Sequence, residues 1–118
     1  HEIGGGNAAN TATAVALLSG ASFLRDKNKN ICTKLLSKVG SDYIGKNAIE
    51  ELKEAGVDLS SPLFRIGEEG TTTGLTTIIV SESEQTRTCL QTPGTCGELT
   101  LQDVDVEMMD EIFEHVVH

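Results

Sequence analysis

A run of glycine that leads straight into a helix of small residues constrains this chain most. Residues 4–6 are all glycine, and residues 7–19 are apolar or small on nearly every helical face. Three glycines leave the main chain uncovered, so a ligand can approach the backbone without meeting a Cβ atom. The free N–H groups at the start of a helix favour an oxygen-rich ligand, and asparagine amides add donors and acceptors. We predict half of a polyol-binding site here, formed by Gly5, Gly6, Asn7 and Asn10. The local alternative is that one asparagine only caps the helix.

The rest of the chain alternates between helical and strand patterns. The clearest helix follows Asp42, because apolar residues recur at helical spacing from Ile44 to Ala55 while charged or polar residues lie between them. Ser41 or Asp42 can cap its start, and Gly56 is a natural residue just past its end. The other predicted elements are strands at 33–39, 63–66, 71–80 and 86–91, and a final helix from about Val106. This alternation favours an α/β sheet with helices on its faces.

Two segments approach phosphate-binding motifs. Gly40–Asn47 is one residue from a P-loop, but Asn47 lacks the hydroxyl that holds magnesium, and Asp42 would place a carboxylate among phosphates. A capped helix start is therefore favoured there. Gly4-x-Gly6-x-x-Ala9 approaches the dinucleotide fingerprint, but the acidic residue about 20 positions further on, Asp26, lies in a loop rich in lysine and asparagine. A dinucleotide-binding oxidoreductase fragment stays open as an alternative.

Composition argues against several partners. Acidic residues outnumber basic ones by 18 to 9, which gives a formal charge of −9, whereas a nucleic-acid groove needs clustered Lys and Arg. No apolar run approaches the ~20 residues that a membrane-spanning helix needs. We therefore expect no nucleic-acid partner, no membrane partner and a cytoplasmic location, with organellar targeting left open.

Cysteine and histidine give little sign of a metal or redox site. The three cysteines lack Cys-x-x-Cys spacing, which predicts reduced thiols that pack inside an intracellular protein. These are Cys32, Cys89 and Cys96. Glu111, His115 and His118 could in principle offer three metal ligands on one helical face, but histidine near a helix carboxyl end is the simpler interpretation. We predict no metal site in this chain.

Four blocks of the sequence stand in a characteristic order. Gly5–Ala12 fits the pattern Gly-Gly-x-x-x-Asn-x-Ala, and Lys38–Gly45 contains a Val-Gly-x-Asp-x-x-Gly turn. Glu51–Asp58 is similar to the helix end and loop that follow this turn. Thr73-Gly74 and Arg87-Thr88 fall in the predicted strand pair. With these blocks the chain resembles the ribokinase (PfkB) family of carbohydrate and nucleoside kinases.

The resemblance implies a fold and a position within it. The implied fold is a ribokinase-like three-layer α/β/α sandwich, present here in part, with a β-hairpin that contributes to the sheet or to a lid. Residues 1–118 would be the N-terminal portion of a single domain, without its first strand and its C-terminal nucleotide-binding part. The family's Gly-Ala-Gly-Asp block, which holds the catalytic Asp, does not occur in residues 1–118. We therefore expect this segment alone to be inactive.

The resemblance also implies a reaction. The family transfers the γ-phosphoryl group of ATP, with Mg²⁺, to a hydroxyl of a sugar or nucleoside. Gly5 and Gly6 would pass close to the sugar, and Asn7 and Asn10 would bind its hydroxyls. Ribose-specific members carry Lys where Asn7 stands, which argues against ribose itself. A homodimer through the lid strands is a further implication. A non-catalytic interaction module that keeps the kinase fold is the alternative from another class.

Overall fold

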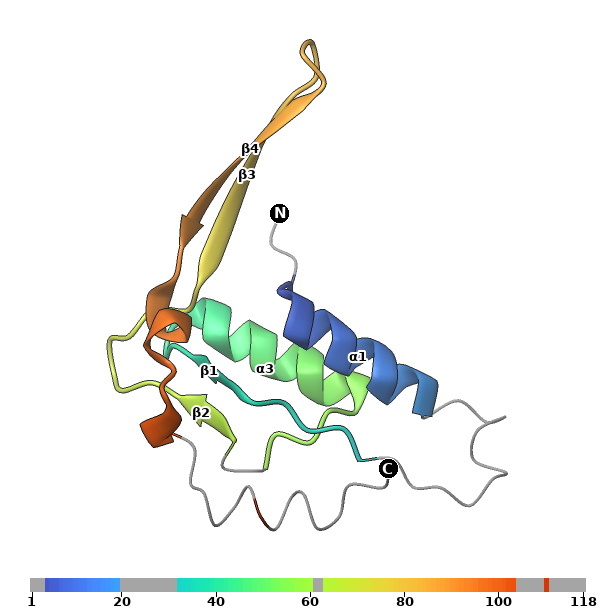
Figure 1. Ribbon diagram of the computed structural model, residues 1–118, viewed down its shortest axis with the longest axis vertical. Coiled ribbons are helices and arrows are strands. Elements are labelled where there is room, and N and C mark those ends of the chain that lie inside the picture. Colours follow the sequence, from blue (N-terminus) through green and yellow to red (C-terminus); the bar gives the residue numbers. More distant parts are fainter. Residues whose placement is uncertain (1–3, 20–31, 61–62, 104–109, 111–118) are drawn as a thin grey trace.

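The computed structural model describes residues 4–19, 32–60, 63–103 and 110, and it consists of a small helical body and a long hairpin (Figure 1). In the body, two helices lie side by side over two short strands, and the hairpin projects away from them. The elements in chain order are α1 (Asn7–Ser19), β1 (Ser37–Val39), α3 (Tyr43–Ala55), β2 (Phe64–Ile66), β3 (Leu75–Ser81), β4 (Thr86–Thr92) and the 3₁₀ helices η1 (Gly94–Glu98) and η2 (Leu101–Asp103). The arrangement is a partial α/β fold, as the sequence predicts.

Helix α3 begins and ends at the predicted residues. The Asp42 side chain accepts a hydrogen bond from the Gly45 amide, and Gly56 ends the helix in the left-handed conformation with φ 93°. The Gly56 main-chain N–H donates hydrogen bonds to the carbonyl oxygens of Leu52 and Lys53 in the last turn. These carbonyl groups would otherwise lack a partner within the helix. Leu52 is buried on the side that faces the strands and α1.

The hydrophobic core is small and joins both helices to the strand layer. Helix α1 contributes two alanines, which let the α3 backbone approach closely, and the segment before β1 contributes a leucine. The buried members are Ala12, Ala16, Leu35, Leu52 and Val57, with Ala9, Leu59 and Phe64 packed against them. Only one face of α1 is covered in this way. The apolar residues on its other faces are exposed in the described part of the chain, although small and apolar residues on nearly every face are typical of a helix buried between layers. Leu17 and Leu18 expose 59% and 58% of their surface.

The body contains a strand–helix–strand unit. β1 and β2 pair in parallel, with Ser37 opposite Phe64, and α3 connects them. The pairing is shorter than the pattern predicts, because Lys34 meets Asp58 only in an isolated bridge and the ladder resumes at Ser37. Parallel strands with a helical crossover run so that their carboxyl ends meet the amino end of the connecting helix.

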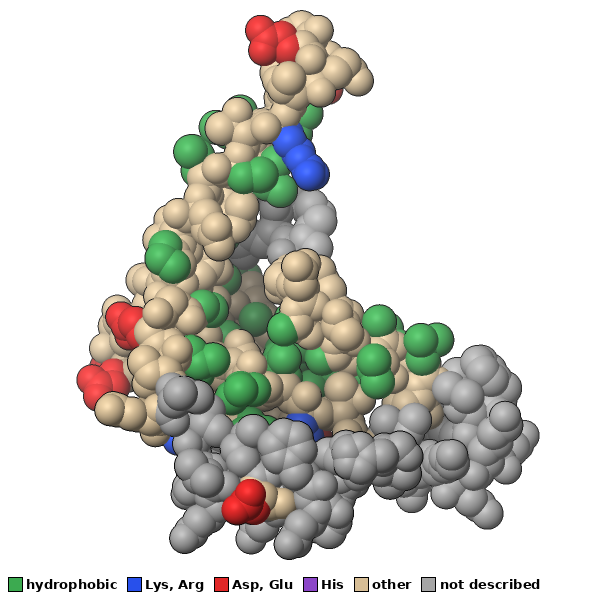
Figure 2. Space-filling model, viewed as in Figure 1, with side chains coloured by type: hydrophobic (Ala, Val, Ile, Leu, Met, Phe, Trp, Pro, Cys, Tyr) green, Lys and Arg blue, Asp and Glu red, His purple; other side chains and the backbone are tan. Residues whose placement is uncertain are grey.

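The hairpin is a separate antiparallel sheet. β3 and β4 pair over their whole length, from Leu75 opposite Thr92 to Ser81 opposite Thr86. Within the described residues neither strand pairs with β1 or β2, so the hairpin does not extend the body's sheet. Its apolar side chains are exposed, and Val80 exposes 65% of its surface (Figure 2).

The expectation for the cysteines is wrong, and several other predicted features lie outside the described residues. Cys32, Cys89 and Cys96 are free but exposed, so they are not packing residues. Residues 94–98, which follow β4, form the 3₁₀ helix η1, and Thr95 within it is buried. The predicted final helix, the surface loop around Asp26, and the possible ligands Glu111, His115 and His118 lie outside the described residues, apart from Asp110, which is helical.

Candidate functional site

The glycine turn, residues 4–6, lies open at the amino end of α1. Gly5 and Gly6 are exposed, and a Cβ atom added to either would meet nothing within 4 Å. Gly6 has φ +92°, a conformation that favours glycine. Its carbonyl accepts the first helical hydrogen bond, which the main-chain N–H of Asn10 donates at 2.9 Å. The main chain here is therefore accessible, and the N–H groups of the first helical turn point away from the helix.

Asn7 and Asn10 lie one helical turn apart, so their side chains share a face of α1. Both residues are exposed, and within the described part of the chain neither side-chain amide has a hydrogen-bond partner. The local alternative, in which one of them caps the helix, is therefore not seen here. Both amides are available to a ligand.

An open groove of about 420 Å³ begins at Asn7 and runs between α1 and the segment before β1. Its walls are mostly apolar. The lining residues are Asn7, Ala8, Thr11, Ala12, Val15, Thr33, Lys34 and Leu35. Of the predicted site residues, the structure brings only Asn7 to this groove, while Gly5, Gly6 and Asn10 lie at the exposed end of the helix.

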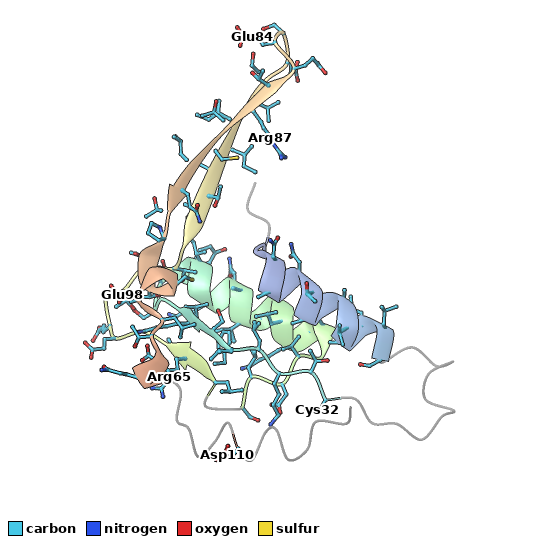
Figure 3. The ribbon with its side chains drawn as sticks, in the orientation of Figure 1. Cys32, Arg65, Glu84, Arg87, Glu98 and Asp110 are labelled. Atoms are coloured by element: carbon cyan, nitrogen blue, oxygen red, sulfur yellow. The ribbon has the colours of Figure 1, made fainter. Side chains whose placement is uncertain are left out.

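The hairpin carries a further candidate residue, Arg87, which the sequence places in a strand without indicating a role in the site. Arg87 pairs with Val80 and points toward the side on which α1 begins (Figure 3). Side chains alternate across a strand, so Ile78 and Cys89 share this inner face with it. Arg87 is exposed, and no ion pair to it occurs among the described residues. A lone basic residue in an otherwise uncharged strand was the signal that could have identified it.

The loop that resembles a P-loop is an ordinary helix start. The Gly45 amide, which a phosphate would need, donates to Asp42 Oδ1 at 2.9 Å. A Cβ atom at Gly45 would lie 2.7 Å from Thr73 Oγ1, which leaves no room for a ligand there. This confirms the capped helix start as the correct interpretation.

The Asp42 carboxylate also holds the root of the hairpin, which we define as residues 71–74 and 93–96. The Thr73 hydroxyl donates to Asp42 Oδ1 at 2.6 Å, and the Thr73 amide donates to Oδ2 at 2.9 Å. These hydrogen bonds, the first of them most, lower the pKa of Asp42 below its usual value of 3.8 because they stabilise the charged carboxylate. Asp42 therefore joins the amino end of α3 to the start of β3.

The described residues give no sign of a metal site or a membrane helix. No group of three His, Cys, Asp or Glu side chains in residues 4–19, 32–60 and 63–103 is placed to hold a metal ion. Neither described helix has the length and continuous apolar character that crossing a bilayer requires.

Comparison with known proteins gives one family and one fold. The family model described as pfkB family carbohydrate kinase matches residues 1–115. No curated protein sequence matches the chain.

Several solved structures share the fold. A fructokinase from Xylella fastidiosa superposes with a TM-score of 0.66 at 21% identity, and this match covers 91% of this chain and 29% of that one. An adenosine kinase from Schistosoma mansoni, in complex with adenosine, gives 0.66 at 20% identity over 95% and 28% of the two chains. An uncharacterized sugar kinase from Pyrococcus horikoshii, in complex with ATP, gives 0.63 at 26% identity over 91% and 30%. The chain thus spans less than a third of the length of these proteins.

Proposed function

Since this chain belongs to the pfkB family of carbohydrate kinases, we propose that it forms the sugar- or nucleoside-binding part of an ATP-dependent kinase. The kinase transfers the γ-phosphoryl group to a hydroxyl of the bound substrate. The observation that carries this proposal is the open glycine turn beside two asparagine side chains on one face of α1, whose amides have no partner among the residues that the structure describes.

A polyol fits the chemistry of this turn. Sugar hydroxyls both donate and accept hydrogen bonds, and side-chain amides offer both functions at once. Gly5 and Gly6 let the substrate approach the main chain, and Asn7 and Asn10 bind its hydroxyls. These contacts hold the acceptor hydroxyl in place, which matters because phosphoryl transfer depends mainly on alignment and on stabilisation of charge.

The hairpin forms a lid over the substrate in this proposal. It rises on the side of the body on which α1 begins (Figure 1). Its inner face combines Ile78 and Val80, which exclude water, with the cationic Arg87. A guanidinium facing the reaction site stabilises the negative charge of a transferred phosphoryl group.

ATP and Mg²⁺ are included in the proposal because the family resemblance implies them. The guanidinium of Arg87, which has no ion pair among the described residues, suits a phosphate oxygen. Those residues include no acidic cluster for a metal, so we assign no ligand of Mg²⁺ to them. The metal, when bound, would neutralise phosphate charge. The catalytic base lies in the part of the protein beyond this chain, and residues 1–118 alone are inactive in this proposal.

The proposed oligomeric state and cellular location also rest on the family. The family resemblance favours a homodimer through the lid strands, and the exposed apolar side chains of the hairpin are suited to such a contact. The protein acts in the cytoplasm in this proposal. The family match favours a kinase over the dinucleotide-binding alternative, and a non-catalytic module with the same fold remains the second candidate.

The experiment assays the full-length protein that contains this chain. Fructose and adenosine are titrated as probes, with and without ATP and Mg²⁺, for the wild type and for Asn7→Ala and Asn10→Ala. Each loss of a hydrogen bond to a sugar hydroxyl weakens binding by about three- to tenfold. Asn47→Ala, the same substitution in helix α3, is the matched control and keeps wild-type affinity.

Each result has a separate meaning. Unchanged affinity in both variants removes the asparagines from the site. Binding of a probe without turnover favours the non-catalytic module. Absence of both binding and turnover with every sugar and nucleoside tested overturns the proposed function.

A further inference from the structure

The hairpin root contains a dense set of contacts, although every residue of the hairpin arm, β3 and β4, except Ser81 is exposed. Thr73 lies at the centre of the root and exposes only 8% of its surface. Its hydroxyl donates to Asp42 Oδ1 at 2.6 Å and accepts from the Gly40 amide at 2.9 Å. Its own amide donates to Asp42 Oδ2 at 2.9 Å. One residue thus contacts the end of β1 and the cap of α3 directly before β3 begins.

The second strand of the hairpin is attached to the same point. The Thr95 amide donates to the Thr72 carbonyl at 2.9 Å, and Thr95 is 4% exposed. The Cys96 thiol donates to the Lys38 carbonyl at 3.0 Å, which ties the root to β1. A Cβ atom at Gly74 would lie 2.8 Å from the Pro93 carbonyl oxygen, so the two strands cross in close contact. The root therefore has little freedom to bend as long as Thr73 keeps its place.

We infer that Thr73 is a positioning residue: its hydroxyl and amide fix the hairpin root to the amino end of α3 and thereby set the angle at which the arm stands to the glycine turn. Thr73 acts on a substrate only through the arm, which carries Arg87 and the apolar side chains of the inner face. The kinetic part of this inference rests on the proposed kinase function, but its geometric part does not.

The hydroxyl of Thr73 can be removed without changing the volume of the side chain. Thr73→Val loses the hydrogen bonds to Asp42 Oδ1 and from Gly40, while Thr73→Ser keeps the hydroxyl. Thr72→Val is the matched control, because Thr72 is exposed and its hydroxyl has no partner among the described residues. A comparison of the three variants separates the hydroxyl of Thr73 from the general effect of a valine in this loop.

The first measurement follows the angle of the arm and needs no activity. Spin labels are placed at Glu84, at the tip of the hairpin, and at Glu54, on the exposed side of α3, after every native cysteine of the protein is changed to serine. The measurement uses the full-length protein without ligand. We expect a broader label-to-label distance distribution for Thr73→Val than for the wild type, Thr73→Ser and Thr72→Val. Equal distributions in all four proteins would overturn the inference, whether or not the protein is a kinase.

The second measurement uses the kinase reaction. A misplaced arm costs about tenfold in kcat/KM for the sugar and raises the ratio of sugar-independent ATP hydrolysis to sugar phosphorylation, because water gains access. The Thr73→Val effect is also expected to shrink in an Arg87→Ala background, since both act through the arm. A purely structural role would lower the amount of folded enzyme without changing that ratio or coupling to Arg87. Such a result would refute the role of Thr73 in positioning.

Discussion

The arm and the root of the hairpin belong to one supersecondary element but differ in the contacts that stabilise them. Every residue of the arm except Ser81 is exposed, and within the described chain its two strands pair only with each other. Two residues before β3 begins, Thr73 is buried and has three hydrogen bonds to the body. A two-stranded ribbon alone is marginally stable in water. We infer from this difference that the root determines where the hairpin stands, and we expect the arm to add little to the stability of the body.

The largest expected effect comes from closing the space at the root. A Cβ atom at Gly40 would lie 2.6 Å from both the Thr71 carbonyl oxygen and the Thr73 nitrogen, which are main-chain atoms that cannot turn away. Gly40→Ala is expected to lower the free energy of unfolding by at least about 3 kcal/mol. Urea unfolding followed by circular dichroism measures this change.

Gly5→Ala is the matched control, because a Cβ atom there meets nothing within 4 Å. Its unfolding free energy is expected to stay within about 1 kcal/mol of the wild type. Similar losses in the two variants would show that the packing at the root is not special.

A pair of leucine substitutions compares the body with the arm. Leu52 is 6% exposed and belongs to the core, whereas Leu90 in β4 is 56% exposed. Leu52→Ala is expected to cost about 2 to 3 kcal/mol of unfolding free energy, because it leaves a cavity among Ala16, Leu35 and Val57. Leu90→Ala is expected to change it by less than about 0.5 kcal/mol. A large loss of unfolding free energy in Leu90→Ala would mean that the arm is packed in solution. The proposed difference between the body and the arm would then be wrong.

A charge at the root makes part of the stability depend on pH. The pKa of Asp42 is lower in the folded chain than its usual value of 3.8, mainly because of the Thr73 hydroxyl. Its contribution is therefore fully present above that value and is lost as the pH falls through the folded pKa. Asp42→Asn places an amide NH₂ group opposite the Thr73 N–H, so we expect a loss of about 1 to 2 kcal/mol at pH 6.

Urea unfolding of the wild type and Asp42→Asn at pH 6 and pH 3 checks this expectation. The difference in unfolding free energy between the wild type and Asp42→Asn should be smaller at pH 3 than at pH 6. Glu50→Gln, on the exposed side of α3, controls for loss of a carboxylate and should leave the unfolding midpoint unchanged at pH 6. A constant difference at both pH values would exclude the charge of Asp42 as the cause.

The smallest expected effect is at a surface ion pair in the body. Lys34 Nζ lies 3.8 Å from Asp58 Oδ2, and the Lys34 side chain is 40% exposed. Exposed pairs of this kind contribute little, because water screens them and ordering two side chains costs entropy. Lys34→Gln should not shift the urea midpoint measurably at physiological salt. A clear shift would show that the parallel bridge between Lys34 and Asp58 needs the ion pair.

Local patterns predicted the elements well because their causes are local. The 3.6-residue period from Ile44, the cap at Asp42 and the left-handed Gly56 all act within a few residues, and the structure shows helix α3 at those bounds. β-branched residues likewise predicted both hairpin strands. The ordered family blocks predicted the fold class, which the structural matches share.

Local sequence patterns could not predict the long-range contacts. The bond from Thr73 to Asp42 joins residues 31 positions apart, and no periodicity marks it. The exposure of Cys89 and of Leu17 could not be predicted either, since an apolar or small residue type does not reveal whether anything covers it. Of the candidate site, the open glycine turn followed from composition, but the inward direction of Arg87 needed the strand register.

Both long edges of the arm present unpaired N–H and C=O groups within the described chain, and β3 carries neither a charge nor a proline along them. Free edges of this kind form hydrogen bonds with any extended strand that they meet. Chain concentration is thus a variable in every measurement on this protein. Dilute and concentrated samples are expected to differ first in the amide exchange of residues 75–92, while α3 stays unchanged.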